Sequence, residues 1–266
     1  MRATAPISER AAQWGRLWGS RAEDWAETEE RQRPTYEEAI RRVAIRAGQR
    51  VLEVGCGSGV FLRLAADLGA EAHGLDASEA LLELARERVP EADLRLGDLG
   101  QLPYENDTFD VVAGFNAFFF AVDMVAAIRE AGRVAKPGAP VVIQVWGRHE
   151  RSDLEAMKDV VRPFFPPRPP DAPPEADLSA PGILEGLATA AGLAPVETFD
   201  TTWAFEFADA DELGRAMLAP AGIAELVGPE SEESVRAQIV EALAPFRTAS
   251  GGYRLSNEFH FVIARA

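Results

Sequence analysis

The chain has 266 residues, a formal net charge of −16 and an apolar fraction of 47%. This length fits one large domain, or a core with a smaller appendage, and the apolar content is enough for a sizeable hydrophobic core. Nucleic-acid binding depends on basic patches, so the acidic balance predicts no nucleic-acid partner. Cys56 is the only cysteine, which excludes an intramolecular disulfide and favours a reducing, cytoplasmic location.

Membrane association is not expected either. The first fifteen residues lack the continuous apolar segment of a signal peptide. The longest apolar run, 111–122, is interrupted by Asn116 and is shorter than the ~20 residues that a membrane-spanning helix needs. The sequence predicts no particular oligomeric state.

Residues 8–47 have the pattern of an amino-terminal helical segment. Ser8 can cap its first helix, Pro34 breaks and restarts the helix, and Gly48 is expected to end it. We therefore treat residues 1–47 as a unit that precedes the main fold.

Strands and helices alternate through residues 48–147, which is typical of a parallel, doubly wound α/β sheet. Right-handed crossovers bring the carboxyl ends of all its strands to one edge, where such sheets bind ligands. The expected strands are 50–54, 71–75, 93–96, 109–115 and 141–146, and the expected helices are 60–68, 78–88 and 122–134.

Residues 148–266 have a different composition, beginning with a proline-dense stretch. Residues 163–174 are expected to be an extended connector, although a ligand for a proline-binding domain is an alternative. Beyond it we expect helices at 183–191, 209–218 and 231–246, and strands at 195–207 and 258–264. In the last strand, residue alternation places His260 opposite Phe259 and Phe261, which predicts a surface position for this histidine.

The glycines of residues 55–59 form the most informative motif. Gly55, Gly57 and Gly59 are spaced G-x-G-x-G between a strand and a helix, and Glu53 stands two residues before them. Glycines allow the backbone to approach a ligand closely, and the start of the next helix offers backbone N–H groups. A dinucleotide site would instead be spaced G-x-G-x-x-G. Cys56 lies inside the loop and is expected to act as a small apolar spacer.

Polar residues follow the next strands at the same edge. Asp76 ends the second strand, where a carboxylate can accept hydrogen bonds from both hydroxyls of a ribose. Its alternative role is to cap the following helix, but Ser78 can do this instead. Asp98 and Asn116 follow the third and fourth strands, with a turn residue and a cap as their respective alternatives.

Four segments in register resemble the class I S-adenosylmethionine-dependent methyltransferases. VLEVGCGSG at 51–59 is similar to the first motif of this family and LDAS at 75–78 to the second. Residues 96–120 and 129–147 resemble the segments around the fourth and fifth strands. The flanks, including WGSRAEDWAE at 18–27, resemble a subgroup that methylates small molecules.

The resemblance implies a Rossmann-like, seven-stranded sheet with helices on both faces. It adds two strands at about 195–207 and 257–265, one of them antiparallel. The implied domains are a helical lid at 1–47, a cofactor-binding core at 48–147, and a remainder at 148–266. The remainder would contain the proline-rich connector at 163–174, the last part of the sheet at about 180–207 and 257–265, and a substrate cap at about 208–250.

The resemblance also implies S-adenosylmethionine as the cofactor and assigns roles to individual residues. Glu53 would support the amino-acid end, the glycines would approach the methionine and ribose, and Asp76 would bind the ribose. The adenine would contact residues after the second and third strands, and the methionyl group would face the fourth. The implied cofactor-binding residues are Glu53, Gly55, Cys56, Gly57, Gly59, Asp76, Ala77, Asp98, Leu99 and Asn116, with Trp25 and Tyr36 from the lid.

A small-molecule acceptor is expected at the same edge, where aromatic side chains concentrate. Their large apolar area favours an apolar or aromatic acceptor, although packing in the core is the alternative. The expected pocket residues are Trp18, Phe118, Phe119 and Trp146. Methyl transfer from a sulfonium needs alignment more than acid–base groups, so no catalytic residue is assigned; His149 is a candidate base. No metal is expected.

Two rival functions stay open at this point. The first is a non-catalytic module that binds S-adenosylmethionine for regulation or assembly. The second is an NAD-dependent oxidoreductase, which the glycine spacing and the segment around Asp98 disfavour.

Overall fold

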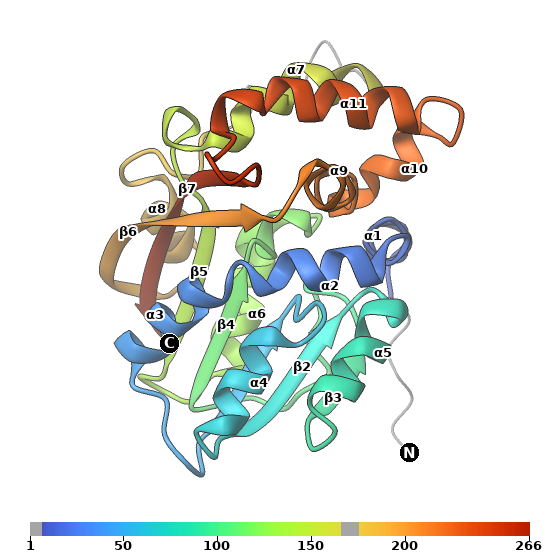
Figure 1. Ribbon diagram of the computed structural model, residues 1–266. Helices are drawn as coiled ribbons and strands as arrows, with labels where there is room; N and C mark the ends of the chain where they lie inside the picture. Colours follow the sequence, from blue (N-terminus) through green and yellow to red (C-terminus); the bar gives the residue numbers. More distant parts are fainter. Residues whose placement is uncertain (1–6, 166–175) are drawn as a thin grey trace.

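The computed structural model describes residues 7–165 and 176–266, and within these ranges it contains one seven-stranded sheet (Figure 1). The strand order is β3-β2-β1-β4-β5-β7-β6, with β1 to β5 parallel and β7 antiparallel to both of its neighbours. The α/β class and the single antiparallel strand are as predicted. The strands are β1 (Arg50–Val54), β2 (Glu71–Asp76), β3 (Asp93–Leu96), β4 (Val111–Phe115), β5 (Pro140–Trp146), β6 (Ala194–Phe207) and β7 (Tyr253–Arg265).

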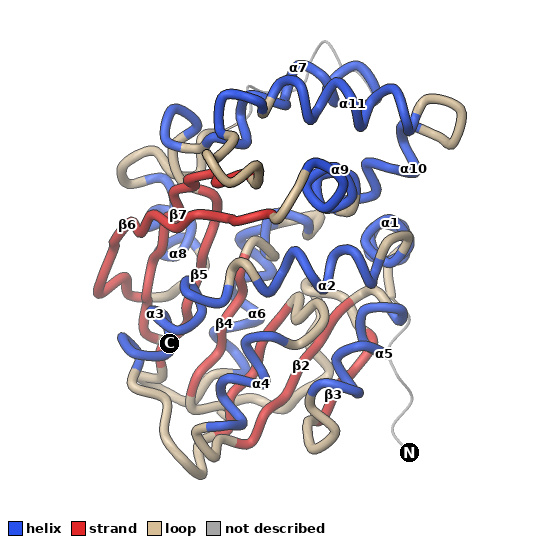
Figure 2. Tube along the Cα trace, viewed as in Figure 1, coloured by secondary structure: helices blue, strands red, loops and turns tan. Residues whose placement is uncertain are grey.

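Helices cover both faces of this sheet (Figure 2). Side chains of α3, α4 and α5 pack in one buried cluster, and those of α6 and α8 pack in another. Each of the strands β1, β4, β5 and β7 contributes residues to both clusters, because alternate side chains point to opposite faces. These helices are α3 (Arg33–Val43), α4 (Val60–Asp67), α5 (Glu79–Arg88), α6 (Met124–Val134) and α8 (Ile183–Ala190).

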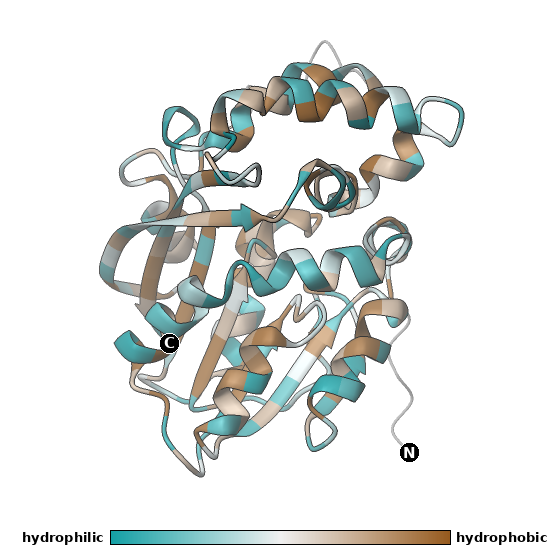
Figure 3. Cartoon of the chain, in the orientation of Figure 1, coloured by the Kyte–Doolittle hydropathy of each residue, from teal (hydrophilic) through white to brown (hydrophobic). Residues whose placement is uncertain are grey.

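The hydropathy of the chain follows this layering. Strands β4 and β5 are buried over nearly their whole length, and the apolar colours of Figure 3 concentrate in the central strands and on the inner sides of the helices. A strand covered on both faces reads as a continuous apolar run, which is how the sequence identified β4.

The amino-terminal segment consists of α1 (Glu9–Gly19), α2 (Ala22–Glu30) and α3. Ser8 caps α1 as predicted, and Pro34 lies in the first turn of α3. The predicted end at Gly48 is wrong: α3 ends at Val43, because Ala44 adopts a left-handed conformation with φ 54°. A left-handed residue cannot continue a right-handed helix, and nothing in the apolar pattern of the sequence marks it.

The prediction for His260 is also wrong. His260 is 5% exposed, and its Nδ1 atom lies 2.6 Å from the Asp200 Oδ1 atom. The reason is that β7 lies between β5 and β6 and contributes residues to the buried clusters on both faces of the sheet. The alternation of residues along β7 could not by itself predict that β6 pairs with this strand.

A second group of helices lies above the carboxyl edge of the sheet in Figure 1, with α1 and α2 between it and the core. It includes α9, which contacts both α2 and α11. The group is formed by α7 (Lys158–Val161), α9 (Ala210–Leu218), α10 (Ile223–Val227) and α11 (Glu232–Ala242). Most of the proline-dense stretch predicted to be a connector, 166–174, lies outside the described residues.

None of the helices within the described ranges is long and apolar enough to cross a membrane.

Glu258 fixes the loop after β5 to the start of β7. It is 1% exposed and accepts hydrogen bonds from Arg148 Nε at 3.0 Å and Arg151 Nη1 at 2.9 Å. Burial by itself would raise the pKa of Glu258, but the hydrogen bonds from these arginines lower it below the usual range.

We expect Glu258→Gln to reduce the free energy of unfolding by about 1–3 kcal/mol at pH 7, because buried charge-assisted hydrogen bonds are lost. A lowered pKa stabilises the fold above the unfolded-state value of about 4.3, and this contribution disappears as the pH falls through the folded-state value. Denaturant titrations from pH 3 to 7 should therefore show a flatter pH dependence for the variant. The control is Glu79→Gln, which removes the exposed ion pair with Arg86 and should cost less than about 1 kcal/mol. Equal losses in the two variants would contradict this role of Glu258.

Candidate functional site

The glycine loop joins β1 to α4 and has the strained backbone that only glycine adopts easily. Gly55, Gly57 and Gly59 have φ angles of 72°, 52° and 82°. A Cβ atom on Gly55 would lie 2.6 Å from the Ala117 Cβ atom. The loop therefore has to be glycine both for its backbone angles and for close packing.

Asp76 binds the glycine loop directly. Its Oδ2 atom accepts a hydrogen bond from the Gly57 N–H at 2.9 Å, and its Oδ1 atom accepts one from the Ser78 N–H at 2.8 Å. Ser78, not Asp76, is the N-cap residue of α5, as predicted. Burial raises the pKa of Asp76 despite these backbone hydrogen bonds. The carboxylate at the end of β2 thus lies between the glycine loop and the start of α5.

Ala77, Asp98 and Leu99 line one small cavity of about 40 Å³, together with Trp14 and Phe120. Asp98 accepts hydrogen bonds from the backbone N–H and the hydroxyl of Ser8 at the start of α1. The residues that follow β2 and β3 are therefore brought together, and the amino-terminal segment covers them.

Two buried oxygens beside the loop have no hydrogen-bond partner among the described residues. They are Glu53 Oε2, at the end of β1, and Asn116 Oδ1, just after β4. Asn116 has a φ angle of 49°, and its amide group donates to the Gln32 Oε1 atom at 3.4 Å. Burying such groups without partners is costly, so these atoms mark a place where a polar ligand would be stabilised.

The amino-terminal helices α1 and α2 contribute to a cluster of aromatic rings. Trp18 packs edge-on against Trp25 with ring centroids 4.6 Å apart, and against Phe120 at 5.7 Å. Phe119 lies 4.7 Å from Phe120. Trp18, Trp25 and Phe119 therefore belong to one continuous aromatic surface over the carboxyl edge of the sheet.

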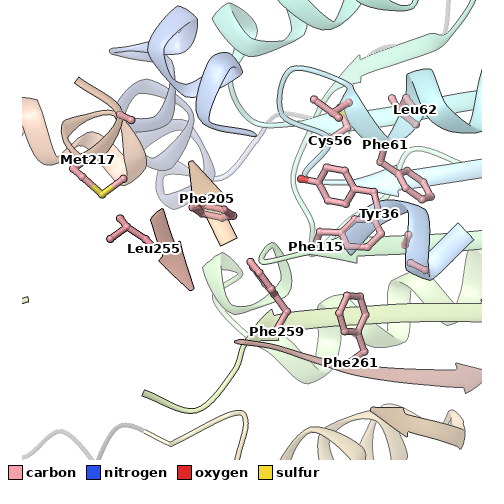
Figure 4. Packing of buried hydrophobic residues seen from close by; sticks show 14 of the residues in the cluster. Tyr36, Cys56, Phe61, Leu62, Phe115, Phe205, Met217, Leu255, Phe259 and Phe261 are labelled. Atoms are coloured by element: carbon pink, nitrogen blue, oxygen red, sulfur yellow. The ribbon is translucent and has the colours of Figure 1, made fainter. Parts of the chain in front are cut away.

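Other aromatic residues named from the sequence lie elsewhere. Tyr36 is 3% exposed and packs against Phe61 and Phe115, as Figure 4 shows. Phe118 is 1% exposed and belongs to the cluster on the other face of the sheet. Trp146 packs against Phe259 with ring centroids 5.0 Å apart.

His149 lies in a short 3₁₀ turn after β5. Its side chain is 61% exposed, and the Nδ1 atom is 2.7 Å from the Glu155 Oε1 atom. The structure thus pairs the candidate base with a surface carboxylate.

The sequence did not identify Glu29, which reaches the glycine loop from the end of α2. Its Oε2 atom accepts hydrogen bonds from the backbone N–H and the hydroxyl of Ser58, both at 2.8 Å. Arg88 of α5 donates to the same hydroxyl at 2.5 Å. The sequence does contain one signal. A carboxylate in the last turn of a helix interacts unfavourably with the helix dipole, so its presence there indicates another role.

Comparisons with known proteins also indicate a methyltransferase domain. A family model described as a methyltransferase domain matches residues 52–143. A probable S-adenosylmethionine-dependent methyltransferase of Mycolicibacterium smegmatis is 36% identical over 114 residues, covering 42% of this chain and 44% of that protein. The ubiquinone biosynthesis O-methyltransferase of Hahella chejuensis is 33% identical over 147 residues, covering 51% of this chain and 62% of that protein. The chain thus spans less than two thirds of the length of these relatives.

Solved structures share the fold. The [4+2]-cyclase SpnF superimposes with a TM-score of 0.59 at 20% identity, over 88% of this chain and 80% of that chain. The YcgJ protein of Bacillus gives a TM-score of 0.57 at 19% identity, over 86% and 97%. Since one of these proteins is described as a cyclase, the fold alone does not decide the reaction. The glycine loop, the residues after β2 and β3, and the matching family model together identify residues 52–143 as a methyltransferase domain of the S-adenosylmethionine-dependent class I type.

Proposed function

We propose that this protein transfers a methyl group from S-adenosylmethionine to a small molecule with an apolar or aromatic surface. The observation that carries the proposal is the convergence of the glycine loop, Asp76, Asp98 and Asn116 at one edge of the sheet, beneath the aromatic side chains of α1 and α2. On this proposal, residues 1–47 are a lid, 48–147 the cofactor-binding core, and about 208–250 a substrate cap. The proposed location is the cytoplasm.

The residues present fit this cofactor. The unpartnered Glu53 Oε2 and Asn116 Oδ1 atoms can accept from the ammonium group at its amino-acid end. Asp76 would hold the ribose, and the cavity lined by Ala77, Asp98 and Leu99 would hold the adenine. We assign Gly55, Cys56, Gly57 and Gly59 to the loop beneath the cofactor. Trp25 and Tyr36 would contact the cofactor from the lid.

The acceptor would lie against the aromatic surface that includes Trp18 and Phe119. Trp146 extends the aromatic area beyond β5, whereas Phe118 is too deeply buried to contribute more than support. Relatives named as ubiquinone and demethylmenaquinone methyltransferases favour small acceptors with an aromatic or quinone-like ring. The shortage of basic residues argues against nucleic acids as acceptors.

The bound cofactor would supply a methyl group on a positively charged sulfur, already activated for in-line displacement. The residues of this chain would then have to align the acceptor and exclude water. The lid serves both purposes, because Trp14, Trp18 and Trp25 cover the edge where the transfer would occur. A general base is needed only if the acceptor loses a proton.

Titration calorimetry with S-adenosylhomocysteine and with NAD separates the proposed function from the oxidoreductase alternative. We expect binding of the first ligand and none of the second. Failure of the folded protein to bind S-adenosylhomocysteine would overturn the proposal.

A second experiment distinguishes an enzyme from a binding module. Phenols, catechols, quinols and aromatic amines would be screened for the release of S-adenosylhomocysteine from S-adenosylmethionine. Product formation with one acceptor class supports the enzyme. Binding without turnover across all classes would favour the non-catalytic module.

Asp76→Ala is expected to weaken S-adenosylhomocysteine binding by ~1–3 kcal/mol, the cost of leaving buried polar groups unpaired. Asp76→Asn should weaken this binding less, because an amide oxygen can still accept a hydrogen bond from the Gly57 N–H. The control Asp67→Ala removes an exposed carboxylate of α4 and should bind normally. Calorimetry measures all of these affinities, and an unchanged affinity for Asp76→Ala would show that the ribose lies elsewhere.

A further inference from the structure

The carboxyl group of Glu29 lies on top of the glycine loop. A Cβ atom on Gly57 would be 2.8 Å from its Oε2 atom and 3.1 Å from its Cδ atom. Together with the hydrogen bonds from Ser58, this contact places a lid carboxyl directly at the loop that would carry the cofactor. Glu29 is 3% exposed, so solvent does not compensate its charge.

The groups that face Glu29 are mainly acidic. Asp76 of β2 and Glu53 of β1 interact with it electrostatically, and the Tyr36 hydroxyl of α3 is affected by both glutamates. The positive group that faces it is Arg88, which is shared with Ser58 and with Glu30 of α2. Burial, with a smaller contribution from Asp76, raises the pKa of Glu29 to about 7, and the pKa of Glu53 is raised well above its usual value.

This acidic environment is short of positive charge. Burying carboxylates without enough compensating cations is unfavourable, and they either take up protons or bind a cation. S-adenosylmethionine carries one more positive charge than S-adenosylhomocysteine, because its sulfur is a sulfonium. A difference of one positive charge is therefore what acidic groups around the glycine loop would respond to.

We propose that Glu29 is a specificity-determining residue of the lid that favours the cationic S-adenosylmethionine over the neutral product S-adenosylhomocysteine. This inference rests on the proposed function. A cationic ligand stabilises the ionised carboxyl group, so binding of S-adenosylmethionine near neutral pH should displace a proton from Glu29. The product keeps the ammonium group but lacks the sulfonium charge, so it attracts the ionised carboxyl group less strongly, which favours its release after the transfer.

The test is titration calorimetry of both ligands with the full chain between pH 6 and pH 8.5, in phosphate and in Tris. These buffers have different ionisation enthalpies, so a difference in observed enthalpy reports proton release. For the wild type we expect proton release with S-adenosylmethionine near pH 7, and an affinity for it that rises with pH. In Glu29→Gln the proton release should disappear, and the preference for S-adenosylmethionine should fall by about tenfold or more at pH 8.

The variant is nearly isosteric, and its amide oxygen can still accept from the Ser58 N–H. The matched control is Glu27→Gln, an exposed position on the same helix, which should behave like the wild type in both measurements. Thermal unfolding checks that each variant is folded. Equal weakening of both ligands in Glu29→Gln, or proton release that persists in it, would overturn this inference. Absence of binding of either ligand to the wild type would instead overturn the proposed function.

Discussion

Gly57→Ala is expected to destabilise the fold by about 2–5 kcal/mol and to weaken S-adenosylhomocysteine binding by more than tenfold. Gly57 has a φ angle of 52°, which alanine adopts with strain, and the added Cβ atom would lie 2.8 Å from the Glu29 Oε2 atom. To relieve this contact, either the loop must move away from Asp76 or α2 must move away from the loop. Urea titrations measure the stability, and calorimetry measures the binding.

The control for this variant is Gly138→Ala. Gly138 has a φ angle of 78°, but a Cβ atom there would meet nothing within 4 Å. Gly138→Ala should therefore lose only the free energy of unfolding that backbone strain costs, about 1 kcal/mol. Its binding of S-adenosylhomocysteine should be unchanged. If Gly57→Ala behaved like Gly138→Ala, the close approach of α2 to the loop would be unimportant.

Phe261→Ala is expected to reduce the free energy of unfolding by about 3–5 kcal/mol. Phe261 is completely buried on β7 and stacks on Phe199 with ring centroids 4.6 Å apart. Removing the ring leaves a cavity in the buried cluster on the face of the sheet that α3 and α4 cover, and pairing with β5 and β6 keeps β7 from shifting to fill it. Chemical denaturation at several urea concentrations measures the loss.

Phe165→Ala is the matched control for this core substitution. Phe165 is 37% exposed, so its replacement should reduce the free energy of unfolding by less than about 1 kcal/mol. A loss for Phe261→Ala that is no larger than the control would show that the ring contributes little to the core.

The core of the fold could be predicted because its signals are local. Strands β1 and β3 have the bounds expected from the sequence, and the others differ at their ends by a few residues. Apolar runs, glycines after helices and the capping serine Ser78 depend on neighbours within a few positions. The right-handedness of the connections then predicted that the carboxyl ends of β1 to β4 lie at one edge of the sheet.

The contacts of the amino-terminal helices could not be predicted in the same way. The approach of Ser8 to Asp98 joins residues 90 positions apart, and that of Glu29 to Ser58 joins residues 29 apart. Nothing local determines where three short helices fold back. The same is true of His260, whose burial depends on β6 pairing with the far side of β7. Long-range packing decided each of these positions.

The position of β7 has a consequence for the order in which the molecule can assemble. Within the described sheet, β6 pairs with β7 and with no other strand, although β6 precedes β7 in the chain. During synthesis, β6 must therefore stay unpaired until residues 253–265 have emerged, after α9, α10 and α11. The edge of β5 is exposed for the same period, and unpaired strand edges promote aggregation. Chains that end before Tyr253 should therefore accumulate as aggregates even though the whole glycine loop is present.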